Sequence, residues 1–509
     1  MLNKQIVNIV NFIRGVEPRE PVDLVKPVRE QIALMKRHNL RGTFLVQYDA
    51  LIDPAFTSLL LPLDPAQFEI GVWFETVQPQ VEAAGLTWRG RFPWDWHAHC
   101  GFSVGYTPEE REKLVDVLYE KFKKTFGYYP RVFGSWFFDS HTIRHVADHY
   151  GVDALCNCKE QYGTDGYTLW GGYYGQGYYP SRQNVFMPAE SEDDQIPAPL
   201  FRMLGSDPVY QYDYGLDLQS GAARWQGVMT LEPVYPRGGG GEKSWVDWYL
   251  AENFNGECLT FGYTQAGQEN SFGWDAMKDG LTYQFALFEK LQNEGKLTVE
   301  PLGDSGRRYK ETYPSTPASA IVAHTAYDDE EKSSVWYSSK YYRINLYTDH
   351  GTFRIRDLHI FSPDFPDPFE TAVCKGNEAT YETLPVIDGN RHSGNGILAG
   401  GYLSIDEDSL GGMQFTDLGD GRAKITYGDL SVELWEDQIL LAYPTDFTLE
   451  ARIGKENHLP TVESWEEHRL SLSYDGTPYS LQSTRGTFRS PTTIASKDGQ
   501  ICLILNSNP

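Results

Sequence analysis

Residues 1–310 alternate strand-like and helix-like segments, which restricts this part of the chain to an α/β domain with a mostly parallel sheet. Helical spacing of apolar residues predicts helices over 22–38, 107–126, 142–150 and 276–293. Short apolar runs predict strands over 6–13, 41–47, 68–74, 131–138, 152–158, 227–231 and 258–263. This succession predicts a distorted (β/α)7-type barrel, with residues 159–226 left largely without assignment.

The helix predicted over 107–126 has the clearest boundaries. Thr107 is a typical N-cap residue, Pro108 suits the first helical position, and Glu110 can complete a capping box. Gly127 follows the helical segment and is expected to end it.

The apolar, aromatic run from Val132 to Phe138 ends in a single acid, Asp139. A run of this length without helical periodicity is typical of a strand buried on both faces. Because ligands of parallel α/β sheets bind at the carboxyl ends of the strands, we expect Asp139 to lie where chemistry takes place.

The last third of the chain has a different texture. After Thr316, short alternating segments such as 354–359 are separated by Gly, Asp and Pro turns, without a long helical pattern. We therefore expect a catalytic barrel over 1–310, a linker over 311–318, and a β-sandwich-like accessory domain over 319–509. This accessory domain either packs as a purely structural element, which the pattern favours, or reaches the barrel mouth.

Composition limits the partners of the chain. Its 509 residues carry 70 acidic and 44 basic side chains, a formal net charge of −26, and this disfavours nucleic acids and anionic membrane surfaces as partners. The six cysteines have no disulfide-framework spacing, and the N-terminus does not resemble a secretory signal. We expect a cytoplasmic protein without a membrane span, and a homo-oligomer is among the states that the sequence leaves open.

Residues 107–155 resemble the central part of the polysaccharide deacetylase-like and related glycoside hydrolase barrels. An acid-rich helix is followed by the break 126–130, a strand, and a helix that ends in Tyr150-Gly151-Val152. The segment 281–299 is similar to the last helix and strand of that superfamily. The resemblance implies a (β/α)7-type barrel and one of two chemistries, metal-dependent deacetylation or metal-independent glycoside hydrolysis.

The metal ligands that the deacetylases carry are not found at the matching positions. The deacetylases carry a pair of Asp residues after their first strand, and the matching residues 11–17 of this chain contain no such pair. Their two histidines are spaced about four residues apart, whereas His97 and His99 are two residues apart. Residues 260–263 also lack the histidine expected at the last strand. We therefore predict no metal and no other cofactor, because a hydrolytic metal site needs about three protein ligands.

The glycosidase branch matches better. Asp139 resembles the nucleophile that family 57 glycoside hydrolases carry after a Trp-containing strand, although that residue is usually Glu. The segment that supplies the acid/base in that family corresponds here to 265–275, which contains Glu269 and Asp275. Glu75 and Glu232 also follow predicted strands and are alternative partners, since a glycosidase needs two carboxyl groups flanking the scissile bond. The predicted catalytic residues are Asp139, as nucleophile or base, Glu269, as general acid, and Glu75.

Aromatic residues in the predicted loops suit a carbohydrate substrate, whose apolar C–H faces lie flat on aromatic rings, although the same residues could simply pack the loops. The predicted substrate contacts are Arg14, Trp73, Trp96, His97, His99, Trp136, Asp165, Glu232, Gln268, Trp274 and Asp275. The leading hypothesis is a glycoside hydrolase acting at the end of a glycan or on a small glycoside. Alternatives are a metal-dependent carbohydrate deacetylase with rearranged ligands and an inactive glycan-binding protein.

Overall fold

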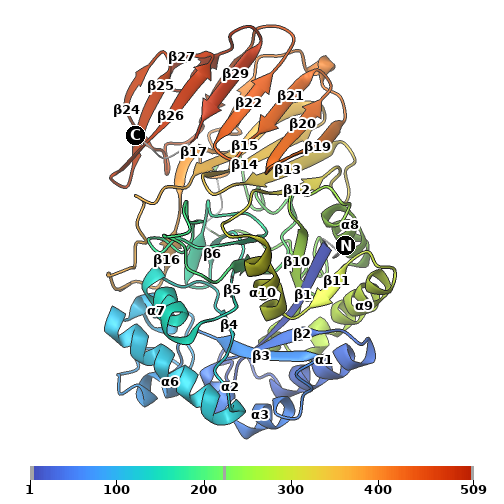
Figure 1. Cartoon of the computed structure of the whole chain (residues 1–509), viewed down its shortest axis with the longest axis vertical. Coiled ribbons are helices and arrows are strands. Elements are labelled where there is room, and N and C mark those ends of the chain that lie inside the picture. Colours follow the sequence, from blue (N-terminus) through green and yellow to red (C-terminus); the bar gives the residue numbers. More distant parts are fainter. Residues whose placement is uncertain (1–4, 222–224, 506–509) are drawn as a thin grey trace.

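The computed structural model describes residues 5–221 and 225–505. Figure 1 shows an α/β part, with its helices on the outside, beneath two stacked β-sheets. The inner of these two sheets, which contains β12 to β15, lies between the outer sheet and the α/β part.

The α/β part is built on a curled, mostly parallel sheet with the strand order β10-β1-β2-β3-β4-β5-β9-β8, and β11 pairs with β1. Within the described residues, no ladder joins β9 to β10, so the sheet is a half-barrel. The strands are β1 (Gln5–Ile13), β2 (Gly42–Val46), β3 (Phe68–Trp73), β4 (Val132–Gly134), β5 (Ala154–Asn157), β8 (Gly177–Tyr178), β9 (Leu200–Arg202), β10 (Gly262–Ala266) and β11 (Thr298–Glu300).

Most helices connect successive strands of this sheet. The helices are α1 (Val25–Arg37), α2 (Tyr48–Ile52), α3 (Pro54–Leu60), α4 (Gln78–Ala83), α5 (Ala98–Gly101), α6 (Pro108–Phe126), α7 (Ser140–Tyr150), α8 (Lys243–Asn253), α9 (Trp274–Asn293) and α10 (Leu302–Thr312). The predicted capping box of α6 is confirmed, since Thr107 and Glu110 exchange hydrogen bonds and Gly127 ends the helix in the left-handed conformation.

Two strand predictions are wrong, and one strand of the sheet was not predicted. β4 ends at Gly134 instead of Phe138, because the chain leaves the sheet and Asp139 already serves as the N-cap of α7. Residues 227–231 do not form a strand, although Thr230 makes an isolated bridge with Ser206. The parallel strand next to β5 is instead β9, inside the segment left without assignment.

The C-terminal region forms two antiparallel sheets, as the sequence predicted. The inner sheet contains β12 (Ser319–Ala323), β13 (Lys332–Ser338), β14 (Tyr342–Asp349), β15 (Thr352–Ile360), β17 (Leu384–Asp388), β18 (Gly400–Leu403), β23 (Thr448–Arg452), β27 (Thr487–Ser490) and β28 (Thr493–Ala495). The outer sheet contains β19 (Met413–Gly419), β20 (Arg422–Tyr427), β21 (Leu430–Leu434), β22 (Gln438–Ala442), β24 (Thr461–Glu466), β25 (Arg469–Tyr474), β26 (Thr477–Arg485) and β29 (Gln500–Ile504). Burial alternates along β20 and β25, as expected for strands with one face on a core.

The two parts of the chain are interlocked. A small sheet joins β6 (Gln161–Thr164) and β7 (Tyr167–Leu169) of the α/β part to β16 (Ala379–Tyr381) of the C-terminal region. All residues of β15 after its first are buried, although half-exposed alternation was expected for residues 354–359. The inner sheet is therefore covered on both faces.

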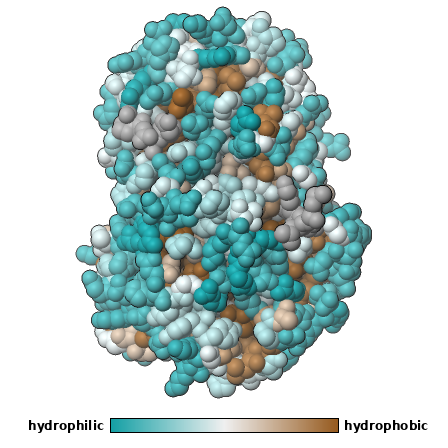
Figure 2. Space-filling model, viewed as in Figure 1, coloured by the Kyte–Doolittle hydropathy of each residue, from teal (hydrophilic) through white to brown (hydrophobic). Residues whose placement is uncertain are grey.

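Hydrophilic residues dominate the face shown in Figure 2, with hydrophobic residues exposed in separate patches. Among the described residues, the helices are all too short or too polar to cross a membrane.

Candidate active site

The carboxyl ends of β1, β3 and β10 bring one arginine and two glutamates together. Arg14 follows β1 directly, Glu75 lies two residues after β3, and Glu269 lies three residues after β10. All three side chains are buried, with exposed fractions of 1%, 1% and 5%, respectively. The structure thus unites three residues that the sequence analysis selected individually.

Arg14 holds the two carboxylates close to each other. Its Nη2 atom lies 3.0 Å from Glu75 Oε2 and 3.2 Å from Glu269 Oε2, so these two oxygens are at most about 6 Å apart. The carboxyl groups of retaining glycosidases are about 5 to 5.5 Å apart, whereas those of inverting enzymes are about 6.5 to 9.5 Å apart. The separation is therefore closer to that of a retaining pair.

The surroundings of Glu75 favour its protonated form. Burial raises the pKa of the Glu75 carboxyl to about 7, although Arg14 and the hydrogen bond from Trp73 act in the opposite direction. The indole Nε1 of Trp73 donates to Glu75 Oε2 at 2.6 Å. A carboxyl group that titrates near neutral pH can both donate and accept a proton during a reaction.

The loop after β10 is tied firmly to the end of β1. Gly267 has φ 109°, and a Cβ atom there would come within 2.1 Å of the Val10 carbonyl oxygen, so only glycine fits this turn. The Asn270 side chain accepts a hydrogen bond from the Arg14 N–H and donates one to the Arg14 carbonyl, both at 2.9 Å. These contacts position Glu269 opposite Arg14.

Several buried polar atoms of this cluster have no hydrogen-bond partner among the described residues. They are Arg14 Nη1, Trp94 Nε1, Trp136 Nε1, Gln268 Oε1 and Glu269 Oε2. Unpaired buried polar atoms are rare and costly in folded proteins. Their concentration at the strand ends indicates a place where a polar ligand or water supplies the missing partners.

A second acidic group lies beside the first. Glu232 accepts hydrogen bonds from Thr230 at 2.9 Å and from the Gln268 amide at 3.3 Å. Burial raises the pKa of Glu232, and the nearby charge of Glu269 acts in the same direction. Lys159, at the end of β5, is buried within range of Glu232, and burial lowers the pKa of its ammonium group.

Aromatic side chains pack against the cluster of Arg14, Glu75 and Glu269. Phe12 stacks on Trp73 at a centroid distance of 4.3 Å, and Trp136 meets Trp73 edge-on at 5.2 Å. The Arg14 guanidinium lies 4.0 Å from the centroid of the Trp94 ring. The predicted contacts Trp73 and Trp136 therefore belong to the same group of side chains as Arg14.

One surface depression reaches the cluster at Glu269, and a second depression lies near the first. The first, of about 340 Å³, is lined by Glu17, Arg19, Glu20, Val22, Glu269, Ser271 and Phe272. The second, of about 570 Å³, is lined by Gly163, Thr164, Asp165, Tyr214, Trp225, Gln226, Gly227, Val228, Tyr235, Pro236 and Arg237. Arg19 lines the first depression and Asp165 lines the second, and Arg19 Nη1 lies 3.5 Å from Asp165 Oδ1. Asp165 therefore lies at the surface between the two depressions.

Asp139 occupies a different environment. Its carboxylate accepts hydrogen bonds from Arg111 at 2.9 Å, Ser103 at 2.6 Å, and the Thr142 N–H and hydroxyl at 2.9 and 2.8 Å. Both Asp139 and Arg111 have fully buried side chains. The carboxylate thus caps α7 and neutralises a buried arginine, a bonding pattern that weighs against the predicted catalytic role.

The Asp139 group fastens the C-terminal region to the barrel. Arg111 also donates to the Phe369 and Ala372 carbonyls, at 2.6 and 2.7 Å, respectively. The Asp367 carboxylate accepts hydrogen bonds from the N–H and hydroxyl of Ser140, which follows Asp139. The sequence pattern Asp-Ser-His-Thr at 139–142 is a recognisable N-cap signal that could have indicated this role.

The histidines lie on the rim. The rings of His97 and His99 are 5.8 Å apart, and His97 Nδ1 lies 3.7 Å from Asp95, whose carboxylate is held by Arg91. Within 5–221 and 225–505, no group of three or more His, Cys, Asp or Glu side chains is arranged to hold a metal ion. The residues around His97 therefore do not fit the mononuclear metal site of a deacetylase.

The other predicted substrate contacts differ in how exposed their side chains are. Trp96 lies beneath the guanidinium groups of Arg91 and Arg19, at 4.6 and 5.3 Å, and so belongs to the rim. Asp275 has 80% of its side chain exposed and pairs with Lys278 on the outer face of α9. Trp274, its half-buried neighbour, packs against the core. The expectation that Asp275 lines the mouth is not supported by this position.

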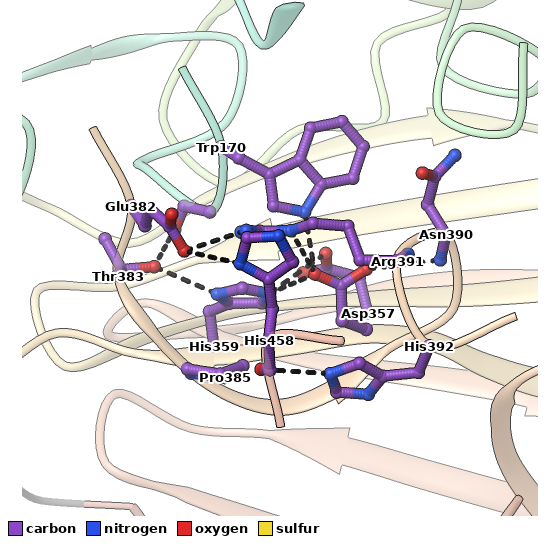
Figure 3. A network of polar contacts seen from close by, with 12 residues as sticks. Trp170, Asp357, His359, Glu382, Thr383, Pro385, Asn390, Arg391, His392 and His458 are labelled. Atoms are coloured by element: carbon purple, nitrogen blue, oxygen red, sulfur yellow. Dashed lines mark hydrogen bonds and ion pairs between the residues drawn. The ribbon is translucent and has the colours of Figure 1, made fainter. Parts of the chain in front are cut away.

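The sequence analysis missed a buried polar network at the base of the inner sheet (Figure 3). Asp388 accepts hydrogen bonds from Trp170 at 2.8 Å and from Arg391 at 3.0 Å, and His359 Nε2 lies 3.5 Å from it. Burial would raise the pKa of Asp388, but Arg391 and His359 hold it well below its ordinary value. Trp170 belongs to the α/β part, so this network joins the two parts.

A second contact brings the inner sheet to the strand ends. Arg343 of β14 donates to Glu160, three residues after β5, at 2.8 Å, and to Asp357 at 2.9 and 2.8 Å. Glu160 also lies 3.5 Å from Arg202 at the end of β9. The C-terminal region therefore helps to position side chains next to Lys159.

Comparisons with known proteins agree with this architecture. No family model matches the sequence, and no curated protein matches it. A crystal structure from Parabacteroides distasonis, described as a candidate glycoside hydrolase/deacetylase, aligns with a TM-score of 0.54 at 15% identity, over 75% of this chain and 90% of that one.

More distant alignments have TM-scores below 0.5. A probable polysaccharide deacetylase from Pseudomonas aeruginosa aligns with a TM-score of 0.38 at 13% identity, over 61% of this chain and 93% of that one. A family 57 branching enzyme from Thermococcus kodakaraensis aligns with a TM-score of 0.32 at 9% identity, over 62% and 72% of the two chains. The fold of this protein therefore resembles that of the P. distasonis structure, the one of these three with a TM-score above 0.5.

Proposed function

We propose that this protein is a carbohydrate-processing enzyme, and specifically a retaining glycoside hydrolase that uses Glu75 and Glu269. The observation that carries the proposal is the buried pair of carboxylates that Arg14 holds within about 6 Å at the carboxyl ends of parallel strands. The shared fold supports a carbohydrate substrate.

The environments of the two glutamates suggest their roles. Glu75, with its raised pKa, is the general acid that protonates the leaving-group oxygen as the glycosidic bond breaks. Glu269, ion-paired with Arg14 and lining a depression, is the nucleophile that bonds to the anomeric carbon. Water, deprotonated by Glu75, then releases the sugar and regenerates Glu269. This assignment replaces the predicted role of Glu269 as the acid.

The surroundings of the pair suit the end of a glycan or a small glycoside. Gln268 lies beside the pair, and its amide oxygen, which has no hydrogen-bond partner among the described residues, offers an acceptor for a sugar hydroxyl. Asp165, Trp96 and His97 are rim contacts in this proposal.

A trapping experiment tests the pair. An activated 2-deoxy-2-fluoro glycoside forms a long-lived ester with the nucleophile of a retaining enzyme, and peptide mass spectrometry locates it. We expect the label on Glu269 after a panel of aryl glycosides has identified a substrate. A label on Asp139 would instead support the pair predicted from the sequence, and turnover without any label would contradict retention.

The metal-dependent deacetylase remains the second candidate, because the P. distasonis structure is described by both activities. In this case His97, His99 and Asp95 would have to rearrange. Deacetylation of a chitin or xylan oligomer that is lost with a chelator and restored by a divalent ion would support it. Sugar binding without turnover of any substrate would support the glycan-binding alternative.

We also propose the predicted division into a (β/α)7-type barrel, 1–310, a linker, 311–318, and an accessory domain, 319–509. The end of α10 at Thr312 and the start of β12 at Ser319 support the linker. Burial of five of the six cysteines suits a cytoplasmic protein.

A further inference from the structure

A cavity of about 170 Å³ lies between the two sheets of the C-terminal region. Strands of both sheets contribute to its wall, and among the described residues its lining contains no charged side chain. The lining residues are Ile355, Leu358, Val386, Ile387, Ile439, Leu441, Leu449, Ala451, Ile453, Leu459, Pro460, Val462, Leu470, Leu472, Leu481, Phe488, Pro491, Thr492, Thr493, Ile494 and Leu503.

The cavity has an opening at one edge of the sandwich. β24 is the last strand of the outer sheet, β27 is the last strand of the inner sheet, and the two are neighbours at this edge. Ile453 and Val462 line the cavity and are nevertheless 36% and 44% exposed. An apolar molecule can therefore reach the interior past an apolar rim.

The size and lining of the cavity define what it can hold. Water gains little in a wall without charges and with only Thr492 and Thr493 as polar side chains. An apolar cavity of about 150 Å³ stays dry and takes a molecule the size of benzene. An unfilled cavity destabilises a fold in proportion to its volume, so occupancy by an apolar group would be favourable.

The stretches of the sequence outside the described residues are only three or four residues long. The residues outside the described ranges are Met-Leu-Asn-Lys at 1–4, Ala-Ala-Arg at 222–224 and Asn-Ser-Asn-Pro at 506–509, none of which is a continuous apolar stretch. We propose that the C-terminal region binds a neutral hydrocarbon group, either a single aromatic ring or an alkyl chain of about six carbons, between its two sheets. This binding site is separate from the candidate active site.

Calorimetric titration of the full chain with benzene and with n-hexane tests the proposal, and the change in melting temperature at saturation provides a second measurement. We expect saturable binding of at least one probe. Ala451→Trp, which places an indole at a half-exposed position of the wall, is expected to weaken binding at least ~10-fold. Val462→Lys adds a charge at the rim of the cavity and is also expected to weaken binding. It replaces the first variant in the test if Ala451→Trp does not fold.

Trp465→Lys is the matched control, because Trp465 lies on the same strand with 45% exposure and does not line the cavity. We expect it to bind the probes as the wild type does. Tighter binding of benzene assigns an aromatic guest, and tighter binding of n-hexane assigns an alkyl chain. The absence of saturable binding of both probes, or equal binding by the wild type and a folded Ala451→Trp or Val462→Lys variant, would overturn the proposal.

Discussion

Two buried arginine-carboxylate clusters contain acids that follow parallel strands of the half-barrel, and the clusters differ in how completely their atoms are hydrogen-bonded. In the Asp139 cluster, four donors occupy the carboxylate and Arg111 donates to backbone carbonyls as well. In the Arg14 cluster, Arg14 Nη1 and Glu269 Oε2 have no hydrogen-bond partner among the described residues, and their contacts are ion pairs, of Nη1 with Glu17 at 3.8 Å and of Oε2 with Arg14 Nη2 at 3.2 Å.

We expect this difference in bonding to distinguish a structural carboxylate from a catalytic one. A saturated carboxylate stabilises the fold and has no acceptor left for a substrate, because an ionised carboxylate has about four lone-pair sites. An incompletely paired cluster is poorly stabilised alone and gains from a ligand. Acids that follow strands thus look alike in the sequence, but they differ in how many hydrogen bonds their carboxylates accept in the folded protein.

The largest expected effect separates the clusters by activity. Glu269→Gln keeps the shape of the side chain and removes the nucleophile, so we expect kcat to fall at least ~10⁴-fold, or about 5 kcal/mol in barrier. The free energy of unfolding in urea should change by less than about 1 kcal/mol. Retained turnover in a folded Glu269→Gln variant would contradict the proposed role.

The second prediction concerns Asp139, where we expect the main effect on stability instead of on turnover. Asp139→Ala leaves Arg111 as an unpaired buried charge and removes the N-cap of α7, so we expect a loss of about 3 to 5 kcal/mol in the free energy of unfolding. Urea denaturation followed by circular dichroism measures it. If stability is kept while turnover disappears, Asp139 is catalytic, as the sequence predicted.

The third prediction concerns pH. The pKa of Glu75 is raised in the folded protein to about 7, so the carboxyl keeps its proton up to that pH and loses it above. We expect kcat/KM to fall about tenfold per pH unit on the alkaline side, about 1.4 kcal/mol per unit, and this limb to disappear from the residual activity of Glu75→Gln. An unchanged alkaline limb in the variant would assign the acid to another group.

The smallest effect is expected at Asp275. Its side chain is exposed and makes surface ion pairs with Lys278 of α9 and Lys26 of α1, so Asp275→Asn should change the free energy of unfolding by no more than about 0.5 kcal/mol. Turnover should also stay within about twofold of the wild type. A large loss of turnover in Asp275→Asn would contradict this prediction and support the role of Asp275 as a substrate contact.

Local signals in the sequence predicted the local structure well. Thr107, Pro108, Glu110 and Gly127 delimit α6 because their capping bonds are made within a few residues of one another. The end of β4 was predicted four residues too late, because the apolar run continues into buried loop positions at Trp136 and Phe137 that pack like strand residues. Burial and strand pairing are different properties, and composition reports only the first.

The candidate site was predicted in its parts. Glu75 was selected because it follows an apolar strand, Glu269 because its segment resembles the one that supplies the acid/base in family 57 glycoside hydrolases, and Arg14 as a predicted substrate contact. Their pairing depends on the strand order β10-β1-β2-β3, which brings together residues that are more than 190 positions apart. In the buried network around Asp388, Arg391 is only three residues away, but Trp170 and His359 come from distant segments, so the sequence did not show that this acid is buried among them.

The sequence by itself determined the α/β and all-β halves of this chain, the boundaries of its capped helices, and the set of acids that follow strands. Those features depend on periodicity and on contacts between near neighbours, which a sequence carries directly. Only the tertiary structure decided that Arg14 pairs with Glu75 and Glu269 and that Arg111 saturates Asp139. The availability of a buried carboxylate for chemistry is set by the donors that folding brings to it from elsewhere in the chain.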